Sequence, residues 1–168
     1  MPANVRYILF FLFFLIVSGY TAFTFWENDF YLKALPSHLG VQEILKKQSE
    51  GSFRESCGGV IFQLSKSTIS AINKEGVTFL NRDLYGRGYQ EKNDRERAYY
   101  TYNKWTKTPI KLTDGLSPGM HCLLKDDKDM AKKVRFAAQH EGSFYTVKSE
   151  AELLLIPELG LLFYAYFG

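Results

Sequence analysis

The sequence predicts an α+β protein: an N-terminal transmembrane helix, then one compact domain with an antiparallel sheet of five to seven strands and one or two packed helices. Three observations support this prediction. Residues 7–26 (YILFFLFFLIVSGYTAFTFW) contain no charged side chain. Several later segments are rich in β-branched and aromatic residues and end at turn-forming residues. The chain of 168 residues, 46% of them hydrophobic, is long enough for one domain and too short for a multidomain enzyme.

The uncharged segment is long enough to cross a bilayer. As a helix, its length of about 30 Å would match the hydrocarbon core of a membrane. Tyr7 and Trp26, at its two ends, suit the headgroup regions. Arg6 and the α-amino group precede the segment, whereas Glu27 follows it before the first cation, Lys33. The positive-inside rule therefore predicts a single-pass protein of the cell membrane, with a cytoplasmic N-terminus and an extracytoplasmic C-terminal domain.

A cleaved signal peptide is the main alternative, and it would leave a secreted or periplasmic domain. It would consist of a basic start, an apolar stretch over residues 7–17 and a cleavage site near Ser18 and Gly19. The apolar run continues to Trp26, however, which is the length of a membrane span. A third interpretation is a buried core helix in a cytoplasmic protein.

With an uncleaved anchor, the chain divides into three parts. Residues 1–26 form the anchor, and residues 27–36 form a connector that ends at Pro36. Residues 37–168 form the domain.

The two cysteines, Cys57 and Cys122, are predicted to form a disulfide, because paired thiols in a small exported domain usually bridge. Closing a loop of this size would stabilise the domain by about 4 kcal/mol. Two unrelated buried thiols are an alternative. In another, Cys57 in the SCGG segment is a nucleophile that His121 or His140 serves as a base, which would make the protein an envelope hydrolase.

The first half of the domain combines one helix with three strands. Residues 37–51 suit a short amphipathic helix that Ser37 caps and that packs on the domain. Alternatively, this helix rests on a membrane surface through Lys46 and Lys47. Branched apolar residues predict strands that form a hairpin or meander, with NKEG as a turn. These predicted strands are residues 59–64, 68–72 and 77–81.

The second half is predicted to contain the core of the sheet. A helix at residues 127–140 begins with Asp126 or Asp127 as its cap and has an apolar face. The segment ELLLIPELGLLFYAYF predicts two central strands joined by a turn at PELG, and the helix would cover one face of them. Further strands are predicted at residues 98–106, 120–125 and 143–149, the second of which would bring Cys122 toward Cys57.

The segment from Arg82 to Lys111 is the strongest candidate for a binding surface. It contains eight cations, four carboxylates and several interleaved aromatic residues, a mixture that can hold an anionic polymer by charge and stacking. Alternatively, the aromatic rings pack on the sheet and the charged loop is only solvated. The candidate binding residues are Arg82, Tyr85, Arg87, Tyr89, Arg95, Arg97, Tyr100, Tyr102, Lys104 and Trp105.

Other patterns favour structural roles. The YGRGY segment lacks the order of a phosphate-binding loop, so Gly86 and Gly88 are expected to allow a mobile turn. Asp126, Asp127 and Asp129 suit a helix cap better than a metal site, and His140 suits a helix C-terminus. We expect no cofactor, no metal and no nucleic acid.

Taken together, these features predict a membrane-anchored protein-interaction module without enzymatic activity. It would act as an inhibitor, a protective protein or a scaffold or assembly factor for a protein partner at the outer face of the membrane. The first alternative is a binding protein for an anionic envelope polymer or lipid, through the Arg82 to Lys111 region. The second is the hydrolase that uses Cys57.

Overall fold

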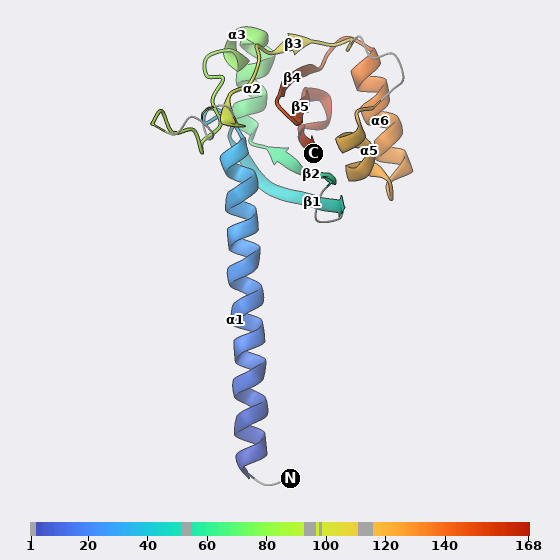
Figure 1. Ribbon diagram of the computed structural model, residues 1–168. Helices are drawn as coiled ribbons and strands as arrows, with labels where there is room; N and C mark the ends of the chain where they lie inside the picture. Colours follow the sequence, from blue (N-terminus) through green and yellow to red (C-terminus); the bar gives the residue numbers. More distant parts are fainter. Residues whose placement is uncertain (1–2, 52–54, 93–96, 98, 111–115) are drawn as a thin grey trace.

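The structure is a computed structural model that describes residues 3–51, 55–92, 97, 99–110 and 116–168. A long helix, α1 (Ala3–Ala34), extends away from a domain that contains one six-stranded antiparallel sheet (Figure 1). The strand order is β1-β2-β6-β5-β4-β3. This arrangement confirms the predicted α+β fold with a transmembrane-like helix. The strands are β1 (Val41–Gly51), β2 (Ser56–Leu64), β3 (Thr106–Lys107), β4 (Phe144–Lys148), β5 (Ala151–Ile156) and β6 (Leu161–Phe167).

The two predicted central strands are confirmed as β5 and β6. They pair from Ala151 and Tyr166 to Ile156 and Leu161, and the short 3-10 helix η1 (Pro157–Leu159) connects them. Gly160 ends this turn in the left-handed conformation, with φ 65°, which glycine adopts without steric cost. The turn therefore suits the PELG sequence.

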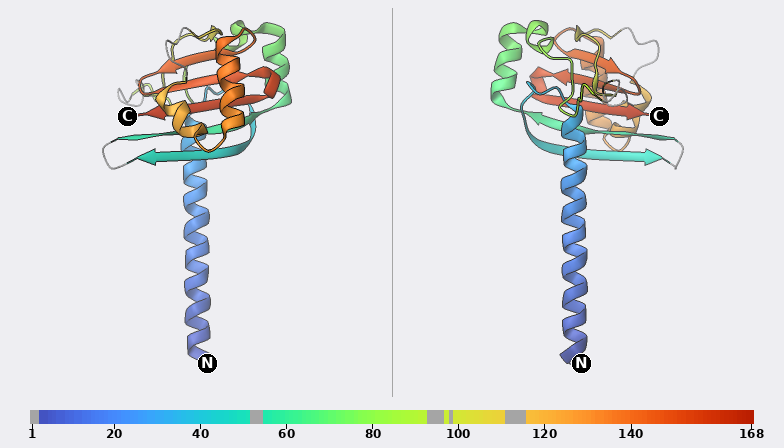
Figure 2. Two further views of the ribbon diagram at one scale, coloured as in Figure 1. Left: turned by 90° about the vertical axis from the view of Figure 1, so that its right-hand side faces the viewer. Right: turned by 60° about the vertical axis from the view of Figure 1, so that its left-hand side comes forward.

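Helices cover both faces of the sheet. The end of α1, with α2 (Lys66–Glu75) and α3 (Val77–Leu80), packs on one face, and α5 (Pro118–Leu124) and α6 (Lys128–Gln139) pack on the other (Figure 2). Alternate side chains of each central strand point to opposite faces, as a strand requires. In β6, Leu162 and Tyr164 join the first core, whereas Leu161 and Phe163 join the second.

The helix predicted at residues 37–51 is wrong, because residues 41–51 form the edge strand β1. This strand pairs with β2 from Val41 opposite Leu64 to Gly51 opposite Ser56. The helical pattern would have placed Leu45 on a buried face, but Leu45 is 49% exposed. Main-chain pairing along the whole strand therefore outweighs a short apolar pattern.

The strands predicted at residues 68–72 and 77–81 are also wrong, because these segments form α2 and α3. The hydroxyl of Ser65 accepts a hydrogen bond from the Thr68 backbone N–H and caps α2. Thr68 and Ile72, one turn apart, are the buried residues of α2. Gly76, with φ 57°, separates the two helices. The β-branched residues that suggested strands pack in helices here.

Two further predictions of strands are corrected. Between residues 98 and 106, of which Ala98 lies outside the described residues, Tyr99 and Tyr100 are helical, and the only residue in a named strand is Thr106, which begins β3. Residues 120–125 belong mostly to the helix α5, which Ser117 caps and which Pro118 begins.

The helix predicted at residues 127–140 is confirmed as α6. The Asp127 carboxylate accepts a hydrogen bond of 2.9 Å from the Met130 backbone N–H and caps the helix. Val134 and Ala138 face the sheet and are buried. The strand predicted at residues 143–149 is confirmed as β4.

The exposed part of α1 is long and apolar enough to cross a membrane, and its most apolar stretch packs against no other part of the described chain. Residues 27–34, which were predicted to belong to a connector, continue the same helix. The helix then enters the first core, where Tyr31 and Ala34 are buried, followed by Leu35. One unbroken helix therefore joins the apolar stretch to the domain.

Candidate functional site

The structure describes nine of the ten predicted binding residues, and it buries two of these nine. Tyr102 and Trp105 are only 2% and 3% exposed and belong to the core, so their rings do not form part of a surface. Arg95 lies outside the described residues. The remaining seven are exposed or half-buried: Arg82, Tyr85, Arg87, Tyr89, Arg97, Tyr100 and Lys104.

Some exposed residues of this segment form ion pairs or ring contacts with one another or with neighbouring residues. The Arg82 guanidinium forms an ion pair with Glu75 and lies 5.2 Å from the centre of the Phe79 ring. The rings of Tyr85 and Tyr89 are 4.2 Å apart. Binding of an anionic polymer through this segment stays a prediction.

The YGRGY segment caps the C-terminal end of α1. The last carbonyl groups of a helix have no partners within the helix, so other donors must satisfy them. The Gly88 backbone N–H donates to the carbonyl oxygen of Lys33 at 3.0 Å, and the Arg87 N–H donates to that of Leu35 at 2.9 Å. The Tyr102 hydroxyl donates to the carbonyl of Ala34 at 2.9 Å. Three donors far along the chain thus hold the end of α1 in the domain.

The chains approach closely in this cap, and at Gly86 the neighbouring atoms belong to the backbone. A Cβ atom at Gly86 would lie 2.8 Å from the Lys33 carbonyl oxygen and 2.9 Å from that of Ala34. A Cβ atom at Gly88 would lie 2.4 Å from the Tyr100 ring. The two glycines, which the sequence assigned to a mobile turn, therefore serve packing at the junction between α1 and the domain.

Lys148 lies in a cluster of tyrosines that sequence reasoning missed. Its Nζ atom is 3.3 Å from the centre of the Tyr99 ring and about 6 Å from the rings of Tyr102 (5.9 Å) and Tyr164 (5.8 Å). This atom is buried and makes no hydrogen bond with the described residues. Burial lowers the pKa of Lys148 to about 8, although the charge of Glu150 opposes this shift.

Such an amine resembles a nucleophilic lysine in its pKa. Its nitrogen is closed off from solvent, however, so a substrate cannot reach it in this conformation. The cluster instead links β4, β6 and the segment before β3. A single lysine in FYTVKS carries no sequence signal that would have revealed this arrangement.

A groove lies between α6 and the η1 turn, and sequence reasoning missed it as well. It encloses about 510 Å³, and Lys133, Phe136, Ile156 and Leu159 are among its lining residues. Phe136 is 61% exposed, and its ring stacks on that of His140 with the ring centres 3.9 Å apart. A large aromatic side chain on the polar face of a helix was the available signal.

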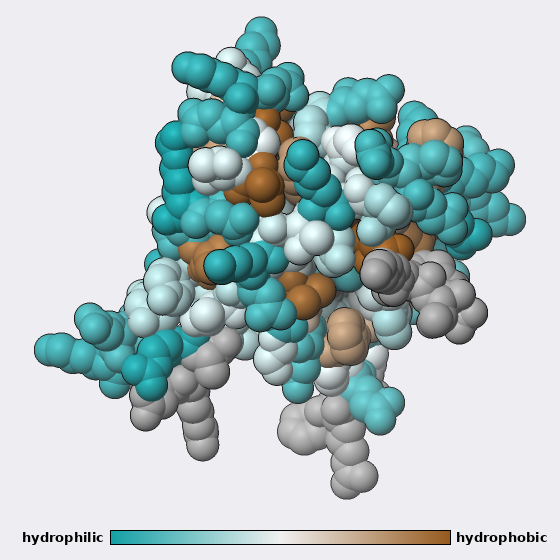
Figure 3. Space-filling view, turned by 90° about the horizontal axis from the view of Figure 1, so that it is seen from above, coloured by the Kyte–Doolittle hydropathy of each residue, from teal (hydrophilic) through white to brown (hydrophobic). Residues whose placement is uncertain are grey.

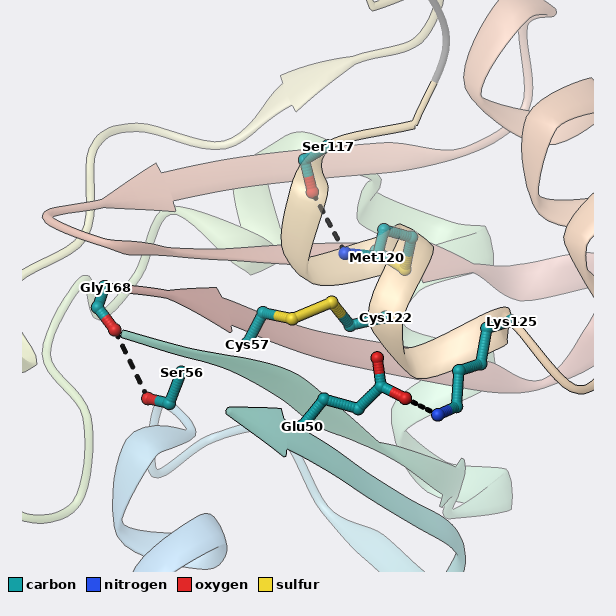
Figure 4. The surroundings of a disulfide bond; sticks show 8 residues. All are labelled: Glu50, Ser56, Cys57, Ser117, Met120, Cys122, Lys125 and Gly168. Carbon is teal, nitrogen blue, oxygen red and sulfur yellow. Dashed lines mark hydrogen bonds and ion pairs between the residues drawn. A yellow bond between two sulfur atoms is a disulfide. The ribbon is translucent and has the colours of Figure 1, made fainter. Parts of the chain in front are cut away.

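The two cysteines are joined in a disulfide that connects β2 to α5 (Figure 4). Their Cα atoms are 6.0 Å apart. Glu50, on the neighbouring strand β1, forms an ion pair with Lys125 beside this bridge. Cys57, Cys122 and Glu50 are close enough to share a metal ion in principle, but both sulfur atoms are covalently occupied. For the same reason, Cys57 is not a free thiolate here.

Two surfaces of the domain differ in their hydrophobicity. The face opposite the N-terminus of α1 is mainly hydrophilic, with hydrophobic side chains in small separate areas (Figure 3). The groove beside α6 combines an exposed aromatic ring with an apolar floor.

Comparisons with protein-family models, with curated proteins and with solved structures found no match.

Proposed function

We propose that the protein is a single-pass membrane protein whose extracytoplasmic domain binds a partner protein and performs no chemistry itself. The observation that carries the proposal is the continuity of α1. The helix presents apolar side chains on all sides along its exposed length and then enters the core at Tyr31 without a break. Exposed apolar side chains of this density need a lipid environment.

The cap on α1 supports a scaffold role. Because Gly88, Arg87 and Tyr102 fix the last turn of the helix, the domain has little freedom to tilt on its anchor. An ion pair between Lys47 of β1 and Glu27 of α1 adds a second fixed point. A domain held in this way presents its surfaces at a constant height above the bilayer.

The extracytoplasmic orientation has two supports. Arg6 precedes the apolar segment, whereas Glu27 and Asp29 follow it, which favours a cytoplasmic N-terminus. The disulfide between Cys57 and Cys122 suits an oxidising compartment.

The groove beside α6 is the surface that we propose for the partner. Exposed aromatic side chains next to an apolar hollow are typical anchors of protein interfaces, and Phe136 has this setting. Residues of α6 line the groove, and α6 packs on the opposite face of the sheet from the end of α1 (Figure 2), so the anchor does not obstruct the groove. A neighbouring membrane protein could approach it from the side.

Photocrosslinking in cells tests this proposal. A photoreactive amino acid in place of Lys133, which lines the groove, should give one discrete adduct with another protein. Phe136→Ala should remove the adduct, whereas Tyr85→Ala, an exposed aromatic residue elsewhere, should leave it unchanged. An adduct that survives Phe136→Ala, or no adduct at all, would refute the proposed interface.

Membrane placement needs a separate experiment. After a carbonate wash, the full chain should stay with the membranes, and protease added from outside should digest the domain. Retention with a protected domain would contradict the proposed orientation. Release of a chain whose N-terminus begins near Tyr20 would indicate a cleaved leader instead of an anchor.

A further inference from the structure

A cavity of about 640 Å³ lies where the domain meets the exposed length of α1. Thr24, Asn28 and Leu32, spaced one helical turn apart, line it from α1. Gly40, just before β1, and residues 41–44 and 47 of β1 line it from the other side, and Arg87 completes it. In Figures 1 and 2, β1 is the strand nearest the exposed length of α1. We call this space the α1–β1 cavity, and its volume is in the range of sites for small ligands.

The α1–β1 cavity lies at the depth of lipid headgroups if α1 spans a membrane. A hydrocarbon core of about 30 Å reaches from Tyr7 to Trp26, because a helix rises about 1.5 Å per residue. On that scale, Asn28 is about 3 Å and Leu32 about 9 Å beyond the core, within or just above the headgroup layer. The exposed ring of Trp26 suits the boundary itself.

The charges in the α1–β1 cavity are of both signs. The Arg87 guanidinium donates one hydrogen bond of 2.7 Å to the Leu39 carbonyl and, within the described part of the chain, has no carboxylate partner. Glu43 is exposed and likewise forms no ion pair with a described residue. Lys47, by contrast, is already bound to Glu27 and Asn28. One cation and one carboxylate therefore remain available to a ligand.

We propose that the α1–β1 cavity binds a phospholipid whose headgroup carries both a phosphate and a primary amine. A guanidinium has several N–H donors in a planar arrangement that suits phosphate oxygens, so Arg87 would hold the phosphate. Glu43 would accept hydrogen bonds from the ammonium group. The acyl chains would continue beside the exposed apolar length of α1. This inference rests on α1 lying in a membrane, which is part of the proposed function.

Native mass spectrometry of the full chain in detergent micelles tests the inference. The micelles would contain equal amounts of ethanolamine, glycerol and choline phospholipids with identical acyl chains. We expect the ethanolamine lipid to be retained about tenfold more than the glycerol lipid, since the loss of one charge-assisted contact has about that effect. Glu43→Gln should abolish this preference, and Arg87→Gln should lower retention of all three lipids.

Matched controls separate a specific site from a general loss of charge. Arg135→Gln, in α6, and Glu141→Gln, just after it, remove exposed charges that do not line the cavity, and they should change nothing. Thermal unfolding of each variant checks that the fold persists, and Glu43→Gln removes no ion pair of the described residues. Equal retention of the three lipids, or a preference for the glycerol lipid, would overturn the inference.

The carbonate wash distinguishes the failure of this inference from the failure of the proposed function. If the wild-type chain stays in washed membranes but shows no headgroup preference, only the cavity assignment falls. If the chain leaves the membranes, the anchor itself is refuted.

Discussion

The Tyr102 hydroxyl donates a hydrogen bond of 2.9 Å to the carbonyl oxygen of Ala34, so a residue of the domain core holds the last turn of α1. Both residues are buried. Tyr102→Phe would leave the carbonyl without this donor, and an unsatisfied buried group costs about 1–3 kcal/mol. We expect the free energy of unfolding to fall by about that amount in urea titrations of the full chain in detergent. Tyr85→Phe, at an exposed position, should have little effect, and equal losses in the two variants would contradict this role of Tyr102.

Gly86→Ala should weaken the same junction. Its Cβ atom would meet the carbonyl oxygens of Lys33 and Ala34, which are backbone atoms and cannot move away as a flexible side chain could. Overpacking of this kind typically costs about 1–3 kcal/mol. Limited proteolysis should cut the variant between α1 and the domain faster than the wild type. Ser49→Ala, on the exposed edge strand, is the control and should behave as the wild type does.

The disulfide should contribute strongly to stability, because it links residues that are 65 positions apart. In the chain-entropy model, a loop of this size corresponds to about 4 kcal/mol. Reduction of the disulfide should lower the urea midpoint of unfolding by the amount that corresponds to this loss of stability. The double variant Cys57→Ser with Cys122→Ser should lower it by the same amount. In unreduced wild-type protein, a thiol reagent should label neither cysteine even after denaturation. Labelling before reduction would show that the bridge is absent in the cell.

Lys148 should make stability depend on pH. Its pKa is lowered to about 8 in the folded chain and is about 10.4 in an unfolded one, so between these values the unfolded state binds more protons. The free energy of unfolding should therefore rise with pH across this window. Below pH 8 the buried Lys148 is charged, so its burial lowers the free energy of unfolding by the full amount. Allowing for partial solvent contact, the gain from pH 7.5 to pH 9.5 is about 1 kcal/mol.

Lys148→Met tests this assignment, because methionine is apolar and of similar length. Urea titrations at the two pH values should show the gain in the wild type and its absence in the variant. Lys104→Met, at an exposed lysine, should keep the wild-type response. A pH response that persists in Lys148→Met would mean that another group causes it.

The sequence was sufficient for those elements whose patterns are local. The apolar run of α1, the Asp127 cap of α6 and the PELG turn between β5 and β6 each depend on neighbouring residues. The disulfide could be predicted from the presence of two cysteines in a domain that was expected to be exported. These features could be predicted because few alternatives compete with them.

Tertiary contacts decided the remaining elements. The residues of β1 have a short helical pattern, but β2 pairs with their backbone along the whole strand. Ser65 and Ser117 each cap a helix in a segment that was predicted as a strand from its apolar residues. Their weight against β-branched neighbours could not be judged without the packing.

The candidate sites were harder to predict because they combine distant segments. Nothing near Gly88 in the sequence indicates that it meets Lys33, and nothing near Arg87 indicates that it lines a cavity with Asn28. The predicted surface relied on the rings of Tyr102 and Trp105, which the core buries. Aromatic composition alone does not separate an exposed ring from a buried one.

The cap on α1 also bears on how the protein is made. The hydroxyl group that secures Ala34 belongs to a residue 68 positions later in the chain. During translation, the residues of the apolar helix therefore leave the ribosome well before Tyr102, whose hydroxyl group holds the end of that helix, has been synthesised. If α1 spans a membrane, as we propose, lipid or an insertion factor would shelter the nascent helix during that interval, and the domain would close around its base only after Tyr102 has been synthesised.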